Sequence, residues 1–248
     1  MRDRPVAGPG ARGLSAPDPV TVGSLTPGVT MRRIFLLSLA LPFLLGSKAV
    51  AQTCVGMPSF TSGKMQVGAG SQFADGTSSF AGTFGYGQAA GLYGKGSLGT
   101  TSYDGLDGSS LDLGANVGYQ VALKTAKPAQ LCPVASLSIG SGPNDVGGTG
   151  IDMSSRNFSF GAAMGAVLSQ TSQMQIVPNA AFQFANTRLS LDDGTTSASG
   201  SESYGLLTLG TGFVFNSRYS LNPSINIPMG LDGSSTSFGL AGAINFGH

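Results

Sequence analysis

The sequence predicts an all-β fold, a single antiparallel barrel of ten strands, with eight strands as the alternative count. Three observations lead to this prediction. The chain alternates large apolar with small or polar residues in segments of about ten residues. The connections between these segments alternate in character, and the charged residues follow the same division.

An export signal precedes the alternating part of the chain. Arg32 and Arg33 stand before an apolar run at 34–46, which is shorter than the roughly 20 residues of a spanning helix. A small-x-small sequence ending at Ala51 follows. Residues 31–51 are therefore expected to be a signal peptide cleaved after Ala51. Residues 1–30 are rich in Pro, Gly and Arg without periodicity, and we interpret them as a disordered leader or a misplaced start.

The mature part, residues 52–248, is long enough for one domain with room to enclose an interior. It carries seven Lys and Arg against ten Asp and Glu, a net charge of −3. No basic surface is available to hold the phosphates of a nucleic acid, so nucleic acid is excluded as a partner.

Alternation is clearest in three segments, 111–123, 158–168 and 219–231, where one face is apolar and the other is small and polar. Such a period of two is typical of half-buried strands and of barrel walls. Weaker copies complete the set of ten expected strands: Met65–Phe73, Phe80–Tyr86, Leu92–Tyr103, Leu131–Ile139, Met174–Phe184, Tyr204–Phe215 and Phe238–Phe246.

Connections and charge indicate which end of the barrel is which. Four connections are short to moderate turns, at 88–91, 124–130, 169–173 and 216–218, and three basic residues fall there: Lys124, Lys127 and Arg218. The other five are expected to be loops rich in Gly, Ser and acidic residues: 74–79, 104–110, 141–155, 192–203 and 232–237. Outer-membrane barrels place short turns in the periplasm and longer loops outside, so both chain ends are expected in the periplasm.

The composition of the second face favours a membrane barrel over a soluble sandwich. A sandwich turns its apolar face inward and covers its other face with charged residues. Here the second face is built from Gly, Ala, Ser, Asn and Gln. These small side chains suit a narrow lumen, which leaves the apolar face for lipid. Lys95 is expected to face this lumen, and Arg188 to lie above the hydrocarbon near lipid phosphate.

These features together resemble the small outer-membrane β-barrel superfamily, which includes the OmpA-, OmpX- and opacity-type barrels. The resemblance covers nearly all of residues 60–248 and includes the loop Asp104–Asp112 and the strand Phe238–Phe246. It implies a bacterial outer-membrane location, contact with membrane lipid and lipopolysaccharide, and insertion by the barrel assembly machinery. That machinery reads a terminal aromatic residue in such barrels, whereas Gly247 and His248 follow Phe246 here.

The sequence offers little for catalysis or metal binding. The one histidine, His248, falls at the periplasmic end, and an outer-rim hydrolase would lack its base, so an enzyme and a cofactor are not expected. Acidic residues that could hold a divalent cation are Asp104, Asp107, Asp112, Asp192 and Asp193. We favour turn formation and loop solubility as their role, and predict no metal site.

Both cysteines, Cys54 and Cys132, belong to the exported part, where the compartment is oxidising. A disulfide between them is expected at the periplasmic end. Three functions are compatible with the sequence: a structural or surface-interaction barrel with acidic extracellular loops and an unknown extracellular ligand, a narrow passive channel for small solutes, and a secreted soluble β-protein.

Overall fold

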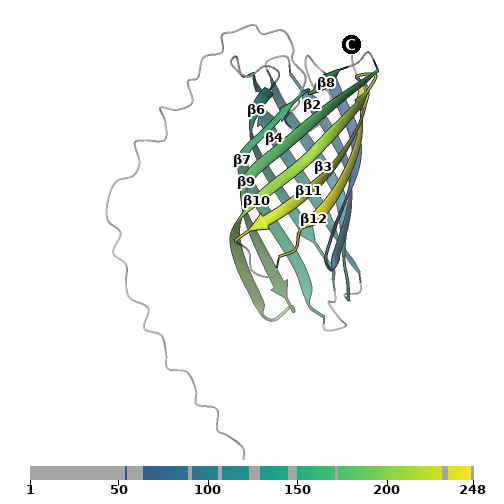
Figure 1. Cartoon of the computed structure of the whole chain (residues 1–248). Helices are drawn as coiled ribbons and strands as arrows, with labels where there is room; N and C mark the ends of the chain where they lie inside the picture. Colours follow the sequence, from purple (N-terminus) through teal and green to yellow (C-terminus); the bar gives the residue numbers. More distant parts are fainter. Residues whose placement is uncertain are drawn as a thin grey trace, which may run out of the picture. The chain divides into compact units, whose positions relative to one another are not determined.

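A computed structural model describes Cys54 and the segments 64–88, 91–105, 108–122, 129–144, 150–170, 173–230 and 234–246. The expected leader and signal peptide lie outside these residues. Among the described residues, no helix is long and apolar enough to cross a membrane. Ten long strands form the wall (Figure 1): β1 Lys64–Ala74, β2 Thr77–Gly87, β3 Leu92–Tyr103, β4 Ser109–Tyr119, β6 Ala129–Ser141, β7 Asp152–Ala166, β9 Met174–Asp192, β10 Ser197–Phe215, β11 Tyr219–Met229 and β12 Ser237–Phe246.

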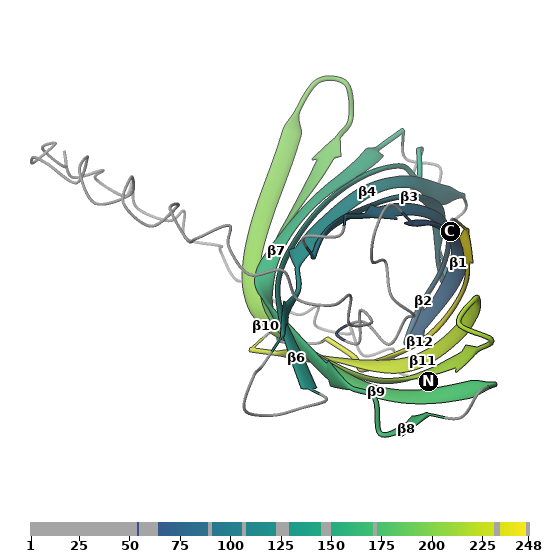
Figure 2. The same ribbon diagram turned by 90° about the horizontal axis from the view of Figure 1, so that it is seen from above.

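The wall closes on itself. Each long strand pairs antiparallel with the strands that precede and follow it, and β1 pairs with β12 over Met65–Phe73 and Phe238–Phe246. Looking along the barrel, Figure 2 shows the strands as a ring around an interior. Closure leaves no free edge along the wall, so the main-chain hydrogen bonds of the sheet are made between strands. The expected ten-stranded antiparallel barrel is confirmed.

Two short strands adjoin the wall at one rim. β5, Val121–Ala122, pairs with β6, and β8, Ser169–Gln170, pairs with β9. The sequence predicts one continuous strand over 111–123, but the structure interrupts it at Gln120, whose backbone N–H donates to Gly91 O at 2.9 Å. Gly91 has a positive φ of 91° and a Cβ there would approach the Gln120 carbonyl oxygen, so this contact favours glycine.

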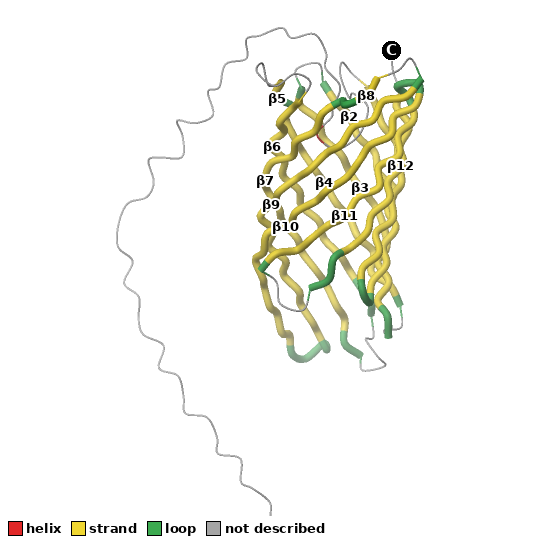
Figure 3. Tube along the Cα trace, in the orientation of Figure 1, coloured by secondary structure: helices red, strands yellow, loops and turns green. Residues whose placement is uncertain are grey.

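The strands run from one rim to the other, with the connections gathered at the two rims (Figure 3). We call the rim that joins β2 to β3, β4 to β6, β7 to β9 and β10 to β11 the turn rim, and the opposite one the loop rim. The tightest connection of the turn rim is the turn between β10 and β11, where Asn216 and Ser217 have φ of 50° and 54°. Two successive positive φ values match the right-handed twist of a hairpin, and Asn tolerates them well.

The expected loop at 192–203 is wrong. β9 and β10 remain paired out to Asp192 and Ser197, so the connection is only the segment 193–196. β11 pairs with β10 only from Gly205 onward, and the outer part of the β9–β10 hairpin leans away from the ring (Figure 2). The expected loop at 74–79 is likewise mostly strand, because β1 and β2 pair up to Ala74 and Thr77.

Candidate functional site

The outer face of the wall carries exposed apolar side chains on each of the ten long strands. Val117 and Phe84 are both 54% exposed, and Ile225 is 38% exposed. A water-soluble protein rarely exposes a continuous apolar surface of this extent. Val117 and Ile225 belong to the apolar faces predicted for 111–123 and 219–231, and both point outward in the structure. This face suits an apolar solvent.

The inner face is polar and internally hydrogen-bonded. Ser136, Ser159 and Gln183 face the lumen from β6, β7 and β9. Ser159 Oγ donates to Gln183 Oε1 at 2.6 Å. Since its single proton is used there, Ser136 is the donor in the 2.6 Å bond between the two hydroxyls. One chain of polar contacts therefore crosses three neighbouring strands.

A second polar chain crosses the next four strands of the ring, β10, β11, β12 and β1. Thr208 Oγ1 donates to Asn226 Oδ1 at 2.7 Å, and Asn226 Nδ2 donates to Ser237 Oγ at 3.3 Å. Gln72 Nε2 donates to the same Ser237 oxygen at 2.8 Å, which joins β1 to the chain. Such contacts depend on the size and polarity of each side chain, whereas the outer face depends on apolar character alone.

Lys95 lies on the inner face of β3, as expected from the sequence, and lines two lumen cavities of about 210 and 340 Å³. Thr83 borders both of them. Asn116, Ser136 and Ser138 border the smaller one, and Gln72 and Asn226 the larger. The middle of the barrel thus combines open volume, uncharged polar groups and one cationic side chain.

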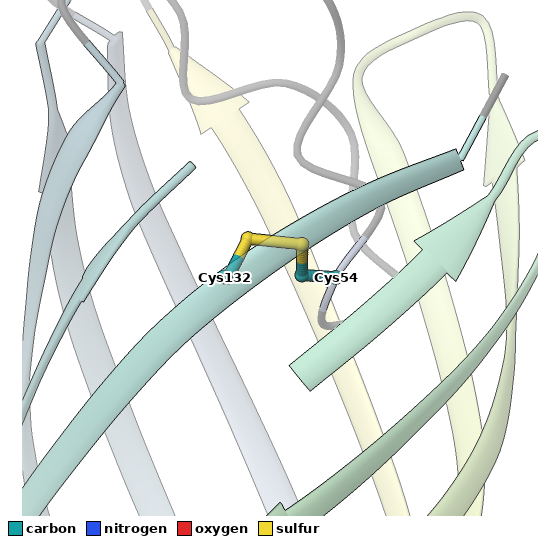
Figure 4. Close-up of a disulfide and its surroundings, with 2 residues drawn as sticks. All are labelled: Cys54 and Cys132. Atoms are coloured by element: carbon teal, nitrogen blue, oxygen red, sulfur yellow. A yellow bond between two sulfur atoms is a disulfide. The ribbon is translucent and has the colours of Figure 1, made fainter. Parts of the chain in front are cut away.

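A small apolar cluster lies inside the wall near the turn rim, where the buried polar side chains Gln66 and Gln130 also lie. Cys54 and Cys132 are joined by a disulfide with a Cα–Cα distance of 6.1 Å, and Figure 4 shows the bridge reaching Cys54 from the β6 ribbon. The surrounding cluster includes Tyr93, Val134 and Ala163, all buried. The Tyr93 ring covers Gly118 of the next strand, where a Cβ would collide with the ring. The disulfide therefore anchors Cys54 against the inner wall.

The acidic residues considered for metal binding do not gather into one site. Asp104 follows β3, and Asp107 lies outside the described residues. Asp112 faces the lumen from β4, where it accepts hydrogen bonds from Thr101 Oγ1 at 2.6 Å and from Ser110 Oγ at 3.2 Å. Across the described segments, no three His, Cys, Asp or Glu side chains are close enough to share a metal ion.

Asp192 and Asp193 form the β9–β10 hairpin tip. Asp192 Oδ1 accepts from Gly194 N at 2.8 Å. Asp193 Oδ1 accepts from Thr196 N at 2.6 Å and Thr195 N at 2.9 Å, and both threonine hydroxyls also donate to the carboxylate. These hydrogen bonds, those from Thr196 first, hold the pKa of the Asp193 carboxyl well below its usual range. The Asp192 and Asp193 carboxylates therefore stabilise the turn through these hydrogen bonds.

Three other residues singled out in the sequence lie outside the described residues: Lys124, Lys127 and His248. Two pairings in the structure were not predicted from the sequence. One is the Tyr93 ring over Gly118, and the other is the alignment of Arg156 with Arg188 across β7 and β9. Strand register decides both, and the alternation within a strand fixes which residues share a face but leaves shifts of two residues between strands open.

A closed barrel with an apolar exterior and a polar interior has the architecture of a transmembrane β-barrel. Ail, the attachment invasion locus protein of Yersinia pestis, is 13% identical to this chain with a TM-score of 0.39, and the match covers 75% of this chain and 100% of that one. The N-terminal β-barrel domain of OprF from Pseudomonas aeruginosa is 10% identical, with a TM-score of 0.34 and coverage of 75% and 98%.

The translocator domain of the autotransporter NalP from Neisseria meningitidis is 8% identical, with a TM-score of 0.38 and coverage of 75% and 87%. No family model matches the sequence, and no curated protein does.

Proposed function

We propose that this protein is an integral outer-membrane barrel of a Gram-negative bacterium with a structural or surface-interaction role. The carrying observation is that all ten strands present exposed apolar side chains outward while the inner face is polar. In hydrocarbon, every backbone polar group needs an internal partner, and a closed sheet provides one. In water the same exterior would favour aggregation.

Cell fractionation combined with heat-modifiable gel migration tests this proposal. We expect the mature protein, residues 52–248, in the outer-membrane fraction, where the unheated sample migrates at a different apparent mass from the boiled one. The difference in migration is expected because a folded barrel resists unfolding by detergent until it is boiled. A soluble β-protein would instead be recovered from the periplasm. Recovery in that soluble fraction would overturn the proposal.

The proposed orientation places the loop rim outside the cell and the turn rim in the periplasm. Support comes from the acidic residues Asp75, Asp104, Asp192 and Asp193, which lie in or beside loop-rim connections, and from Arg218 at the turn rim. The outer part of the β9–β10 hairpin, which leans away from the ring (Figure 2), would then offer surface for an extracellular partner. An epitope inserted at Gly194 should be accessible to antibody on intact cells, whereas the same epitope at Ser217 should not; the reverse pattern would invert the orientation.

A narrow channel is the second candidate. It is favoured by the two lumen cavities beside Lys95. The disulfide-linked cluster around Tyr93 and Cys132 occupies lumen space at the turn rim, so we expect low conductance. In planar bilayers, Cys54→Ser/Cys132→Ser should conduct more than the wild type if this cluster limits passage. If neither protein conducted, the channel proposal would be rejected and the structural or surface-interaction role would remain.

A further inference from the structure

Two arginines lie directly opposite each other on the outer face of the barrel. β7 and β9 pair with Arg156 aligned to Arg188. Arg156 shares its face with the exposed Phe158 and Phe160, and Arg188 shares its face with Phe184, so both guanidinium groups leave the wall on the outer side. Like charges in this arrangement repel each other and destabilise a sheet unless a counter-charge is present.

Nothing in the described part of the chain supplies that counter-charge. Arg188 Nη2 donates to Ser199 Oγ at 3.1 Å, and no carboxylate of a described residue forms an ion pair with either guanidinium. The acids that share this face, Asp152 and Asp192, stand four residues further toward the loop rim, about 13 Å along each strand. The pair is therefore open to an external anion.

The height of the pair on the wall indicates where that anion lies. On β7 and its continuation, outward apolar side chains extend from Phe158 to Leu168. Ten residues cover about 33 Å along a strand, or about 25 Å along the barrel axis at a tilt near 40°, which is the usual height of an apolar belt. Arg156 is the next outward residue beyond this belt, and Ser154 and Ser190 follow it. The arginines thus mark the boundary where headgroups begin.

We propose that Arg156 and Arg188 form a binding site for the phosphate group of an anionic lipid in the outer leaflet. A guanidinium binds phosphate through two parallel hydrogen bonds, and two adjacent guanidinium groups match the charge of a phosphate monoester. The Ser199 hydroxyl lies beside Arg188 as a further polar group. The inference rests on the proposed membrane location. That the phosphate belongs to a lipid is argued from the aromatic residues that lie beside the pair on the apolar belt.

Those aromatic residues form a continuous apolar surface. The ring centroids of Phe158 and Phe160 are 5.9 Å apart, and those of Phe160 and Phe184 are 5.7 Å apart. An acyl chain attached to a phosphate held at Arg156 would run down this surface. A free inorganic phosphate would gain the charge contacts alone, so the site should favour a phosphorylated lipid over the free ion.

Native mass spectrometry of the folded barrel, released from zwitterionic detergent, tests the proposal. The probes are phosphatidic acid and phosphatidylcholine with identical acyl chains, supplied in equal amounts. Wild-type protein should retain phosphatidic acid preferentially. In Arg156→Gln/Arg188→Gln this retention should fall about tenfold or more, because charge-assisted hydrogen bonds are lost. The control Arg218→Gln removes one exposed arginine from the turn rim and should retain the lipid as the wild type does.

Several results would overturn the site. Unchanged retention in the double glutamine variant, or an equal loss in Arg218→Gln, would remove the assignment to the arginine pair. Displacement of the lipid by an equal concentration of inorganic phosphate would replace the lipid site with a free-anion site. Heat-modifiable migration of each sample shows separately whether a barrel has formed, so failure of the proposed membrane function is distinguishable.

A lysine variant covers the case in which the double glutamine protein does not fold. Arg156→Lys/Arg188→Lys keeps both charges but loses the planar fork that binds phosphate through two hydrogen bonds. Its retention of phosphatidic acid should therefore lie below that of the wild type. Retention equal to the wild type would contradict recognition by the guanidinium groups.

Discussion

Val117 and Asn116 are neighbours on β4, yet one lies on the outer face and the other lines a lumen cavity. The outer face carries exposed apolar side chains on every long strand, so almost any large apolar residue suits it. The inner face is specified residue by residue, as in the bonds joining Ser136, Ser159 and Gln183. We therefore expect the wall to tolerate apolar exchange outside but only size-matched exchange inside.

The largest expected effect concerns the covalent link on the inner face. Replacing both Cys54 and Cys132 by serine removes a closed loop of 79 residues. The chain-entropy model gives a loss of up to about 4.5 kcal/mol in the free energy of unfolding. Denaturant unfolding in lipid vesicles measures it. An unchanged midpoint would mean that the bridge adds no stability, and alkylation of both cysteines without reductant would show that it is absent.

A charge on the outer face is expected to have the next largest effect. Val117→Arg or Ile225→Arg places a cation at the middle of the apolar belt and should cost about 2 to 4 kcal/mol of stability. The matched control is Asn116→Ala on the inner face, which should cost less than about 1 kcal/mol. If the control lost as much stability as Val117→Arg, measured by the same unfolding experiment, our assignment of the two faces would fail.

Crowding of the inner face gives a smaller effect. Gly118→Ala places a Cβ against the buried Tyr93 ring, so the cluster must shift, at a cost of about 1 to 3 kcal/mol. At Gly94 a Cβ has an ordinary contact of 3.8 Å with Asn116 O, and Gly94→Ala should be nearly neutral. Thermal unfolding of the two variants compares them, and equal stability would show that the ring moves freely.

The smallest effect is expected at the hairpin tip, beyond both faces. Hydrogen bonds to the Asp193 carboxylate lower its pKa in the folded state. The contribution of these hydrogen bonds to the stability of the tip is complete above the pKa that Asp193 has in the unfolded chain. It is lost only as the pH falls through the lower pKa of Asp193 in the folded state. At pH 5 the tip should therefore stay formed. NMR resonances of Thr195 and Thr196 report it, and a transition in them near the usual Asp pKa would contradict the assignment.

The alternation of apolar residues was enough to predict the barrel. Leu92–Tyr103 and Met65–Phe73 match β3 and β1 closely because every second residue there faces lipid or lumen. The same signal fails at the loop rim. Asn186 to Ser203 has little apolar alternation, yet its backbone continues the β9–β10 ladder. Main-chain pairing needs no apolar side chain, so the true ends of these strands were not visible in the sequence.

Candidate site residues were predictable only where a single residue carries the signal. The exported part of the chain contains two cysteines in an oxidising compartment, and this was sufficient to predict the Cys54–Cys132 bridge. Lys95 was predicted to face the lumen because it lies within a strand segment whose second face is small and polar. Arg156 was not singled out from the sequence, because the alternation predicted β7 only from about Phe158. Its alignment with Arg188 depends on the register between β7 and β9, which only the closed sheet determines.

The seam between β1 and β12 also has a kinetic consequence. Met65 pairs with Phe246, at a sequence separation of 181 residues, whereas the other long strands pair with their nearest long neighbours along the chain. The entropy lost on joining such distant segments is large, so we expect this seam to form late and slowly. Until then, the unpaired edges of β1 and β12 could pair with strands of other chains. The disulfide between Cys54 and Cys132 can form earlier, since neither cysteine belongs to β12. We therefore expect a folding intermediate in which the sheet is still open but already cross-linked.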